Sequence, residues 1–463
     1  MKRVLLWLLL ATLTLPALPD AAPAAKGGSR ARRAAGAPLP SRQGVLLKGL
    51  LPEGLRLLIW YDPELEVETA CLAVGVGSQH DMERRQGAAA LTAEVVRGGH
   101  SGLPAAELAA AWEKDGTSLE VRSDEDAALF LLPQSPGGFR DGLMALGHLV
   151  ERAEIRPEDV ELARDRALRQ FQDREPWSEA ELALRHELYN QFGYHRVPHG
   201  TPATLAEVDR DVCHNYYLQY YRPNNSVLVV TGPVTPEEVR RTATQAFAEW
   251  KYGYIPPASP REPAPLEHCS AESFEGIEGL AAVLGAAVVP HLVLDDRLAL
   301  EVCAEALAPA ADTAGAPGGP GAWRRGGLRR HRLCDELRLA WTSTDSEVAG
   351  SVERWRAELQ ELDAGLPPER LARLAETCLD RLLGDEHWTA EAARATLFGW
   401  RVDTPDEFLR AAAGLRPERV RDAARRWLAL EHWGVVSTLR RSALEAALSR
   451  TLAAPAGRSS GAP

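Results

Sequence analysis

The chain has 463 residues, of which 45% are hydrophobic and 25% charged, and its formal net charge is −12. The composition is that of a globular protein, and the length allows two or more domains with substantial cores. The acidic balance gives no support for nucleic-acid binding, which usually depends on a basic face, but it leaves a basic peptide partner open. Six cysteines show no CxxC spacing, so we expect most of them to be small buried apolar residues.

Residues 1–24 have the features of a secretory signal peptide. Lys2 and Arg3 precede the apolar run Val4–Leu18, and small residues suitable for cleavage follow at Ala22-Pro23-Ala24. The apolar run is short for a transmembrane span, and an uncleaved N-terminal anchor is the alternative. We therefore expect an exported protein, in a bacterial periplasm, in which residues 25–43 form a disordered spacer.

Residues 44–252 are expected to form one α+β domain. Alternating apolar residues bounded by turn signals predict strands at Val45–Lys48, Leu55–Tyr61, Val67–Val76, Leu119–Ser123, Ala127–Leu132 and Ser226–Thr231. Helical periodicity predicts helices at Ala88–Arg97, Pro104–Lys114, Gly138–Glu151, Pro157–Arg174, Ser178–Gln191 and Val208–Tyr221. Because short turns join neighbouring strands, the sheet should be antiparallel, with helices on one face.

A second domain is predicted at residues 270–451, after a Pro-rich linker at 253–269. Its first elements are a strand at Leu280–Val289 and a helix at Asp295–Leu307. The stretch 308–327 is rich in Pro, Gly and Ala and is expected to be an inserted mobile loop. Residues 452–463 are expected to be a disordered tail.

The end of the second domain repeats a pattern of the first. Val208–Thr231 predicts a helix, a polar turn and a strand, and Pro417–Thr438 predicts the same order. The repeat favours two similar halves within one chain.

Three passages of the chain together indicate a family. The first is Gly87-Ala88-Ala89-Ala90-Leu91-Thr92-Ala93-Glu94, which opens the helix after two strands. The others are Gly193-Tyr194-His195-Arg196-Val197-Pro198-His199-Gly200-Thr201-Pro202 and Tyr220-Tyr221-Arg222-Pro223-Asn224-Asn225-Ser226-Val227-Leu228-Val229-Val230-Thr231-Gly232. In this order they resemble the pitrilysin/insulinase (M16) metallopeptidases over about residues 44–440. The resemblance implies two homologous α+β domains of the LuxS/MPP-like metallohydrolase fold, each an antiparallel sheet packed with helices.

The resemblance also shows which zinc-site residues are missing. The family's first helix carries the inverted motif His-x-x-Glu-His, and a Glu on a later helix is the third zinc ligand. These four positions fall on Ala90, Ala93, Glu94 and Gln170. Because a single carboxylate does not hold zinc, we predict a degenerate site with no metal, no cofactor and no catalytic residue.

A passage in the second domain suggests where substrate contacts would lie. Leu333–Trp341 resembles the family's "LFQELREKRGLAYS", with four residues deleted. The family's Arg and Tyr in this passage help to hold the substrate, and they correspond to Arg338, expected at a helix end, and Trp341. These two residues are the candidates for a substrate groove.

Two other clusters were weighed. His195 and His199 are four residues apart, but Pro198 places them in a loop, where packing is a simpler explanation than a metal site. The basic residues Arg324-Arg325 and 329–332 were interpreted as the solvated edge of a loop, with an acidic partner or a membrane surface as the alternative.

The resemblance implies a function without catalysis. In the family, short chains pair so that one supplies the zinc and the other supplies the opposite wall of the peptide chamber. This chain is therefore expected to form a heterodimer with a zinc-binding M16 peptidase chain and to contact the peptide substrate, without nucleic acid or a membrane span. The alternative is a stand-alone periplasmic peptide-binding or assembly protein on the same scaffold. A neighbouring gene for a chain with an intact His-x-x-Glu-His motif would favour the heterodimer.

Overall fold

The computed structural model describes residues 44–98, 118–134, 138–173, 177–189, 193–256, 263, 266–267, 270–273, 281–307, 324–343, 357–428 and 432–437. The expected signal peptide, spacer, C-terminal tail and helix Pro104–Lys114 lie outside these residues, as does most of the linker and of the 308–327 insertion. Among the residues described, no helix combines the length and apolar character needed to cross a membrane.

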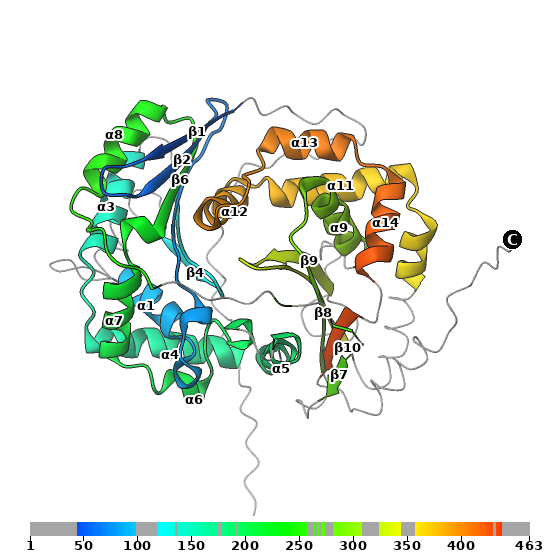
Figure 1. The fold of residues 1–463 in the computed structure, drawn as a ribbon, viewed down its shortest axis with the longest axis horizontal. Coiled ribbons are helices and arrows are strands. Elements are labelled where there is room, and N and C mark those ends of the chain that lie inside the picture. Colours follow the sequence, from blue (N-terminus) through cyan, green and yellow to red (C-terminus); the bar gives the residue numbers. More distant parts are fainter. Residues whose placement is uncertain are drawn as a thin grey trace, which may run out of the picture. The chain divides into compact units, whose positions relative to one another are not determined.

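The first half contains a six-stranded sheet with the strand order β1-β2-β6-β3-β5-β4 (Figure 1). Its strands are β1 (Val45–Leu50), β2 (Arg56–Tyr61), β3 (Glu68–Val74), β4 (Glu120–Ser123), β5 (Ala128–Gln134) and β6 (Ser226–Gly232). Each lies where alternating apolar residues predicted a strand. Neighbouring strands are antiparallel except β2 and β6, which are parallel.

The second half contains a five-stranded sheet with the order β7-β11-β8-β10-β9. Its strands are β7 (Ser270–Ser273), β8 (Ala281–Val289), β9 (Arg324–Arg330), β10 (Asp335–Ser343) and β11 (Trp433–Ser437). Only β7 and β11 are parallel. The order and directions repeat those of β2-β6-β3-β5-β4, with β11 in the place of β6. The helix-and-strand repeat seen in the sequence is thus a repeat of strand topology.

Twelve helices are bounded within the described residues. They are α1 (Ala88–Arg97), α3 (Phe139–Glu151), α4 (Pro157–Asp173), α5 (Trp177–Tyr189), α6 (Pro202–Leu205), α7 (Arg210–Tyr220), α8 (Pro236–Ala246), α9 (Leu294–Leu307), α11 (Pro368–Leu382), α12 (Asp385–Phe398), α13 (Pro405–Ala413) and α14 (Pro417–Trp427). In the first half α1 packs against α4 and α7, and α3 against α8. In the second half α9 packs against α11, α13 and α14.

Both faces of the first sheet are covered. Every residue of β3 and β6 is buried, as expected for strands with no solvent-facing side. One set of alternate residues, including Ile59 and Leu72, joins the core formed with α1, α3 and α8. The opposite face is covered by α12, where the rings of Trp60 and Trp388 lie 5.6 Å apart. The prediction of helices on one face only is therefore wrong, because α12 comes from the second half.

The second sheet is in turn covered by a helix of the first half. α5, from the first half, packs on β8 and β11 through Ala180, Leu184 and Leu188. Arg56 on β2 strengthens the reciprocal contact, because its Nη1 donates hydrogen bonds to the carbonyl oxygens of Thr396 (2.8 Å) and Leu397 (3.1 Å) near the end of α12. Each half thus supplies a helix to the other half's sheet.

Two predictions for the second half are corrected. Residues 324–327 begin β9, although they were assigned to the inserted loop. Arg338 lies within β10, paired with Ala286 and Gly327 on either side, and so is not at a helix end. The physical reason is that β10 forms hydrogen bonds with two neighbouring strands, which the short passage Leu333–Trp341 does not reveal.

Candidate functional site

Helix α1 is the buried centre of the first half. It starts at Gly87, whose φ of +93° favours glycine. The carboxylate of Asp81 then accepts hydrogen bonds from the backbone N–H groups of Gly87 (2.7 Å) and Ala89 (3.0 Å). Burial raises the pKa of Asp81 to about 7, although both N–H groups favour its charged form. The cap fixes the start of the helix without any help from a bound group.

The four positions compared with the zinc site lie on α1 and α4, which pack together. Ala90 is 8% exposed and Ala93 is completely buried, and neither side chain has a donor atom for a metal. Glu94 pairs with Arg97 at 2.7 Å, and Gln170 is an exposed amide. These side chains do not fit a zinc ion. Nowhere in the described part of the chain do three His, Cys, Asp or Glu side chains group as a metal site would require.

A cavity of about 330 Å³ lies between residues of the two halves. The first half contributes residues of β4, of the turn after it, of α4 and α5, and of the segment 197–200. The second half contributes residues of α9, β9 and α12. Gln170 and His199 both line this cavity, whereas no residue of α1 does. Of the four degenerate zinc positions, only Gln170 is among the residues that line this cavity.

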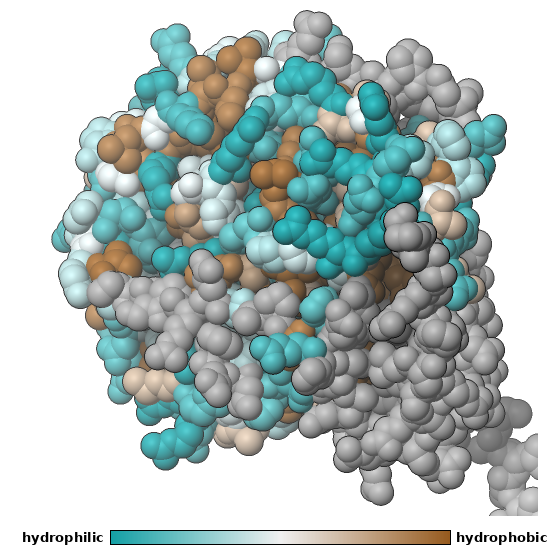
Figure 2. Space-filling view, turned by 45° about the vertical axis from the view of Figure 1, so that its right-hand side comes forward, coloured by the Kyte–Doolittle hydropathy of each residue, from teal (hydrophilic) through white to brown (hydrophobic). Residues whose placement is uncertain are grey.

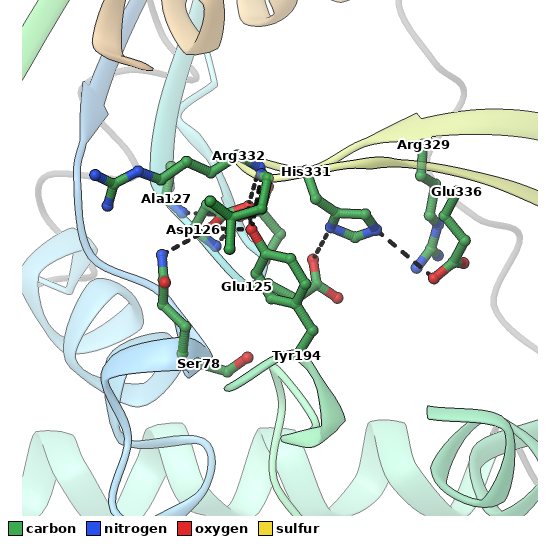
Figure 3. Close-up of polar contacts among 12 residues, drawn as sticks. Ser78, Glu125, Asp126, Ala127, Tyr194, Arg329, His331, Arg332 and Glu336 are labelled. Atoms are coloured by element: carbon green, nitrogen blue, oxygen red, sulfur yellow. Dashed lines mark hydrogen bonds and ion pairs between the residues drawn. The ribbon is translucent and has the colours of Figure 1, made fainter. Parts of the chain in front are cut away.

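His331, in the turn between β9 and β10, lies beside the cavity and is 2% exposed. Its Nδ1 is 3.2 Å from the carboxylate of Glu125 and its Nε2 is 3.7 Å from that of Glu336 (Figure 3). Burial alone lowers the pKa of His331, but the two carboxylates outweigh burial and raise it to about 10. The imidazole is therefore protonated at neutral pH and links the β4–β5 turn of the first half to β10 of the second.

Two arginines extend this buried network. Arg185 on α5 pairs with Glu125 and, at 3.0 Å, with Glu181 on its own helix. Arg338 pairs with Glu181 at 3.1 Å and with Glu336 at 2.7 Å. Burial raises the pKa values of these glutamates, but the neighbouring arginines outweigh it and hold the pKa values of Glu181 and Glu336 well below their usual range. A substrate would reach the guanidinium of Arg338 only by displacing a carboxylate.

Tyr194 connects the same region through hydrogen bonds. Its hydroxyl donates to the carboxylate of Asp126 at 3.0 Å and accepts from the backbone N–H of Leu333 at 3.2 Å. The backbone N–H of Arg332 donates to Asp126 at 2.7 Å, as Figure 3 shows. The passage that begins at Gly193 thus helps to join the halves.

The other sequence candidates take different places. Nε2 of His195 lies 3.0 Å from the carboxylate of Glu83. His195 does not belong to a cluster of metal-binding side chains among the described residues. For Trp341 only the backbone is described, and it pairs with Val283 on β8. The basic residues 329–332 are not a solvated loop edge, because they end β9 and form the turn into β10 beside buried carboxylates. Their position depends on strand pairing, which a basic run in the sequence does not reveal.

Glu125, Glu181, Arg185, His331 and Glu336 were not recognised from the sequence. One signal was available, since Glu181 and Arg185 have the i, i+4 spacing of a helical ion pair. Nothing local links them to His331 or Glu336, which lie about 150 residues further along the chain.

Comparison with known proteins supports the resemblance to the M16 family. The profile described as the peptidase M16 inactive domain matches residues 207–339, from the loop before α7 into β10. Over these residues the chain matches the M16 peptidase family. The match includes the third of the three passages, Tyr220–Gly232, from which the resemblance was drawn.

The curated relative that the chain matches is distant in sequence. An uncharacterised zinc protease of Mycobacterium leprae is 24% identical over 210 residues, which make up 45% of this chain and 47% of that protein. The match thus spans about half of that relative's length.

Solved structures share the fold. An M16 inactive-domain structure from Pseudomonas fluorescens has a TM-score of 0.74 at 16% identity, covering 85% of this chain and 98% of its own. The first half of the periplasmic protease PqqL from Escherichia coli has a TM-score of 0.67 at 14% identity, covering 90% of this chain and 97% of its own. The expected M16-type α+β fold is confirmed.

Proposed function

We propose that this M16 chain is an exported, non-catalytic subunit that pairs with a zinc-binding M16 peptidase and forms part of its peptide chamber. The observation that carries the proposal is the chemistry of α1 and α4. Ala90 and Ala93 have no metal-binding or basic group, and Ala93 is part of the hydrophobic core. Loss of a general base alone costs roughly 10²–10⁴ in rate.

Export is supported by the signal-like residues 1–24 and by one structural neighbour. That neighbour, PqqL, is a periplasmic protease of Escherichia coli. For this chain, periplasmic location is part of the proposal.

One surface feature supports the proposed pairing with a partner chain. β1 is an edge strand of the first sheet, and its Val45 and Leu50 are 52% and 69% exposed. The turn after β1 is contacted by Tyr252, which is exposed like Tyr254 close by in the sequence. The face shown in Figure 2 is mostly hydrophilic, with apolar side chains in separate patches. An edge strand beside exposed apolar groups suits pairing with another chain.

The test is co-expression of this chain with an M16 chain of the same genome that carries an intact His-x-x-Glu-His motif. We expect the two chains to co-purify and to hydrolyse peptides in a zinc-dependent way that neither achieves alone. Leu50→Glu should weaken co-purification, whereas Met82→Glu, at an exposed apolar residue outside the β1 edge, should not. Chelator-sensitive hydrolysis by this chain alone would disprove the proposal.

The second candidate is a stand-alone peptide-binding or assembly protein. It is favoured by the pairing of Arg338 with Glu181 and Glu336, which occupies the guanidinium that the partner model assigns to substrate. Peptide binding by the purified chain, together with normal peptidase activity of the zinc chain in its absence, would support this alternative.

A further inference from the structure

The side chains that line the cavity between the halves are more often basic than acidic. Six arginines line it: Arg122, Arg185, Arg297, Arg329, Arg330 and Arg394. Against them stand four carboxylates, those of Asp124, Glu125, Glu181 and Glu391. The protonated His331 adds a seventh cation to the lining. Three carboxylates behind the lining, those of Glu120, Asp335 and Glu336, face Arg122, Arg330 and His331. The whole chain, by contrast, has a net charge of −12.

Some of the cations are well neutralised. Arg394 pairs with Asp124, and Arg185 pairs with Glu125 and Glu181. These pairs account for most of the carboxylate charge in the walls. Arg122 pairs at 2.6 Å with Glu120, which does not line the cavity, and Arg329 lies 3.5 Å from Glu181.

Arg297 and Arg330 lie over the rings of Phe408 and Trp400, and each keeps a buried nitrogen without a hydrogen-bond acceptor among the described residues. The side chain of Arg297 is 5% exposed, its Nη2 lies 3.4 Å from Glu391, and its buried Nε has no hydrogen-bond acceptor among the described residues. The side chain of Arg330 is 9% exposed, and its Nε makes no hydrogen bond there either, with Asp335 at 3.6 Å. A buried guanidinium N–H without an acceptor lowers the stability of the folded protein.

The two guanidinium groups also act on one another. Burial lowers the pKa of Arg330, and the charge of Arg297 lowers it further. For Arg329 the nearby Arg338 is the main cause of a lowered pKa, followed by burial. An anion placed among these groups would relieve this repulsion, because it interacts favourably with each of them.

The cavity also limits the size and chemistry of its ligand. Its volume, about 330 Å³, is at the low end of the range of ligand pockets, roughly 300–1,000 Å³. The planar fork of a guanidinium matches carboxylate and phosphate oxygens. The hydroxyl of Ser123, buried and without a described hydrogen-bond partner, can donate to the same oxygens.

We propose that this cavity binds a small oxyanion with two or more negative charges, of the carboxylate or phosphate type, held by Arg297 and Arg330. The ligand would bridge the halves, because α4, α5 and β4 form the opposite walls. The site does not depend on the proposed partner role. It would be present in the isolated chain.

The test is calorimetric titration of the purified chain with inorganic phosphate, pyrophosphate, succinate and citrate, with chloride and acetate as singly charged controls. We expect one site per chain for at least one multivalent anion and weaker or no binding of the controls. Preference among the four anions distinguishes a phosphate ligand from a carboxylate ligand. Binding should also raise the melting temperature with ligand concentration.

Arg297→Gln and Arg330→Gln should each weaken this binding at least tenfold. Arg152→Gln is the matched control, since Arg152 is an exposed arginine paired with Glu249 outside the cavity. If a glutamine variant does not fold, Arg330→Lys keeps the charge without the planar fork and should still lose most of the affinity. Unchanged affinity in the folded variants, no binding of any multivalent anion, or binding of acidic peptides only would overturn the proposal.

Discussion

His331 keeps a positive charge inside the protein because carboxylates face both of its ring nitrogens. Glu125 approaches from the β4–β5 turn and Glu336 from β10, while the rings of Tyr189 and Tyr194 pack at its sides. Removing one partner of a buried ion pair typically costs about 3–5 kcal/mol, because the remaining charge is left uncompensated. His331 is therefore expected to contribute to stability in a pH-dependent way.

The direction of this pH dependence follows from the pKa of His331, which rises from 6.5 to about 10 on folding. Its contribution to stability is complete below pH 6.5 and is lost as the pH rises through 10. His331→Gln should lower the free energy of unfolding at pH 6 by about 3 kcal/mol, and the difference from the native protein should shrink towards pH 10.

Urea unfolding between pH 6 and pH 10 measures this difference directly. His186→Gln is the control, because His186 is an exposed histidine on α5. A difference that stays constant over the pH range would show that His331 acts through packing rather than charge.

The residue-level predictions from the sequence rest on a comparison of motifs. Comparison of motifs located the positions Ala90, Ala93, Glu94 and Gln170 on two helices that do pack together. The comparison could not identify the pairing of Arg338 with Glu181, because the two residues lie on different elements of different halves. Such pairs are set by the packing of α5 on the second sheet.

At the scale of elements, α3 and α8 show how closely two helices of the first half approach. A Cβ atom built at Gly147 on α3 would lie far inside contact distance of the carbonyl oxygen of Ala246 on α8. The neighbour is backbone and cannot rotate away. Glycine at position 147 is therefore needed for the packing of the two helices.

Gly147→Ala should destabilise the protein by about 1–3 kcal/mol, the usual cost of overpacking, despite the better helix propensity of alanine. Gly414→Ala provides the comparison, since its Cβ would come no closer than 3.5 Å to Arg410 and its φ is −89°. Chemical unfolding of both variants should show a loss only at position 147. Equal midpoints for the two variants would mean that α3 and α8 separate easily.

At the scale of the molecule, the exchange of α5 and α12 joins the halves. Without α12, the face of β3 and β6 that carries Cys71 and Val229 would lose its cover. Without α5, Ala286 and Val288 on β8 would be exposed. Each half alone would present a large apolar surface to water.

We therefore expect the chain to unfold in one cooperative transition. Residues 44–256 produced alone should aggregate or lack a sharp thermal transition, and co-production with residues 266–437 should restore a soluble complex. Calorimetry and size-exclusion chromatography measure both properties. A sharp, reversible melt of residues 44–256 alone would show that α12 is dispensable.

The sequence by itself determined the family resemblance and most strands and helices of the first half, because these depend on local periodicity and on short motifs. Tertiary structure alone decided the exchange of α5 and α12, the strand β9 within a basic run, and the buried network around His331. These features arise from contacts between segments far apart in the chain, and a side chain's charge or apolar character does not show which distant segment will meet it.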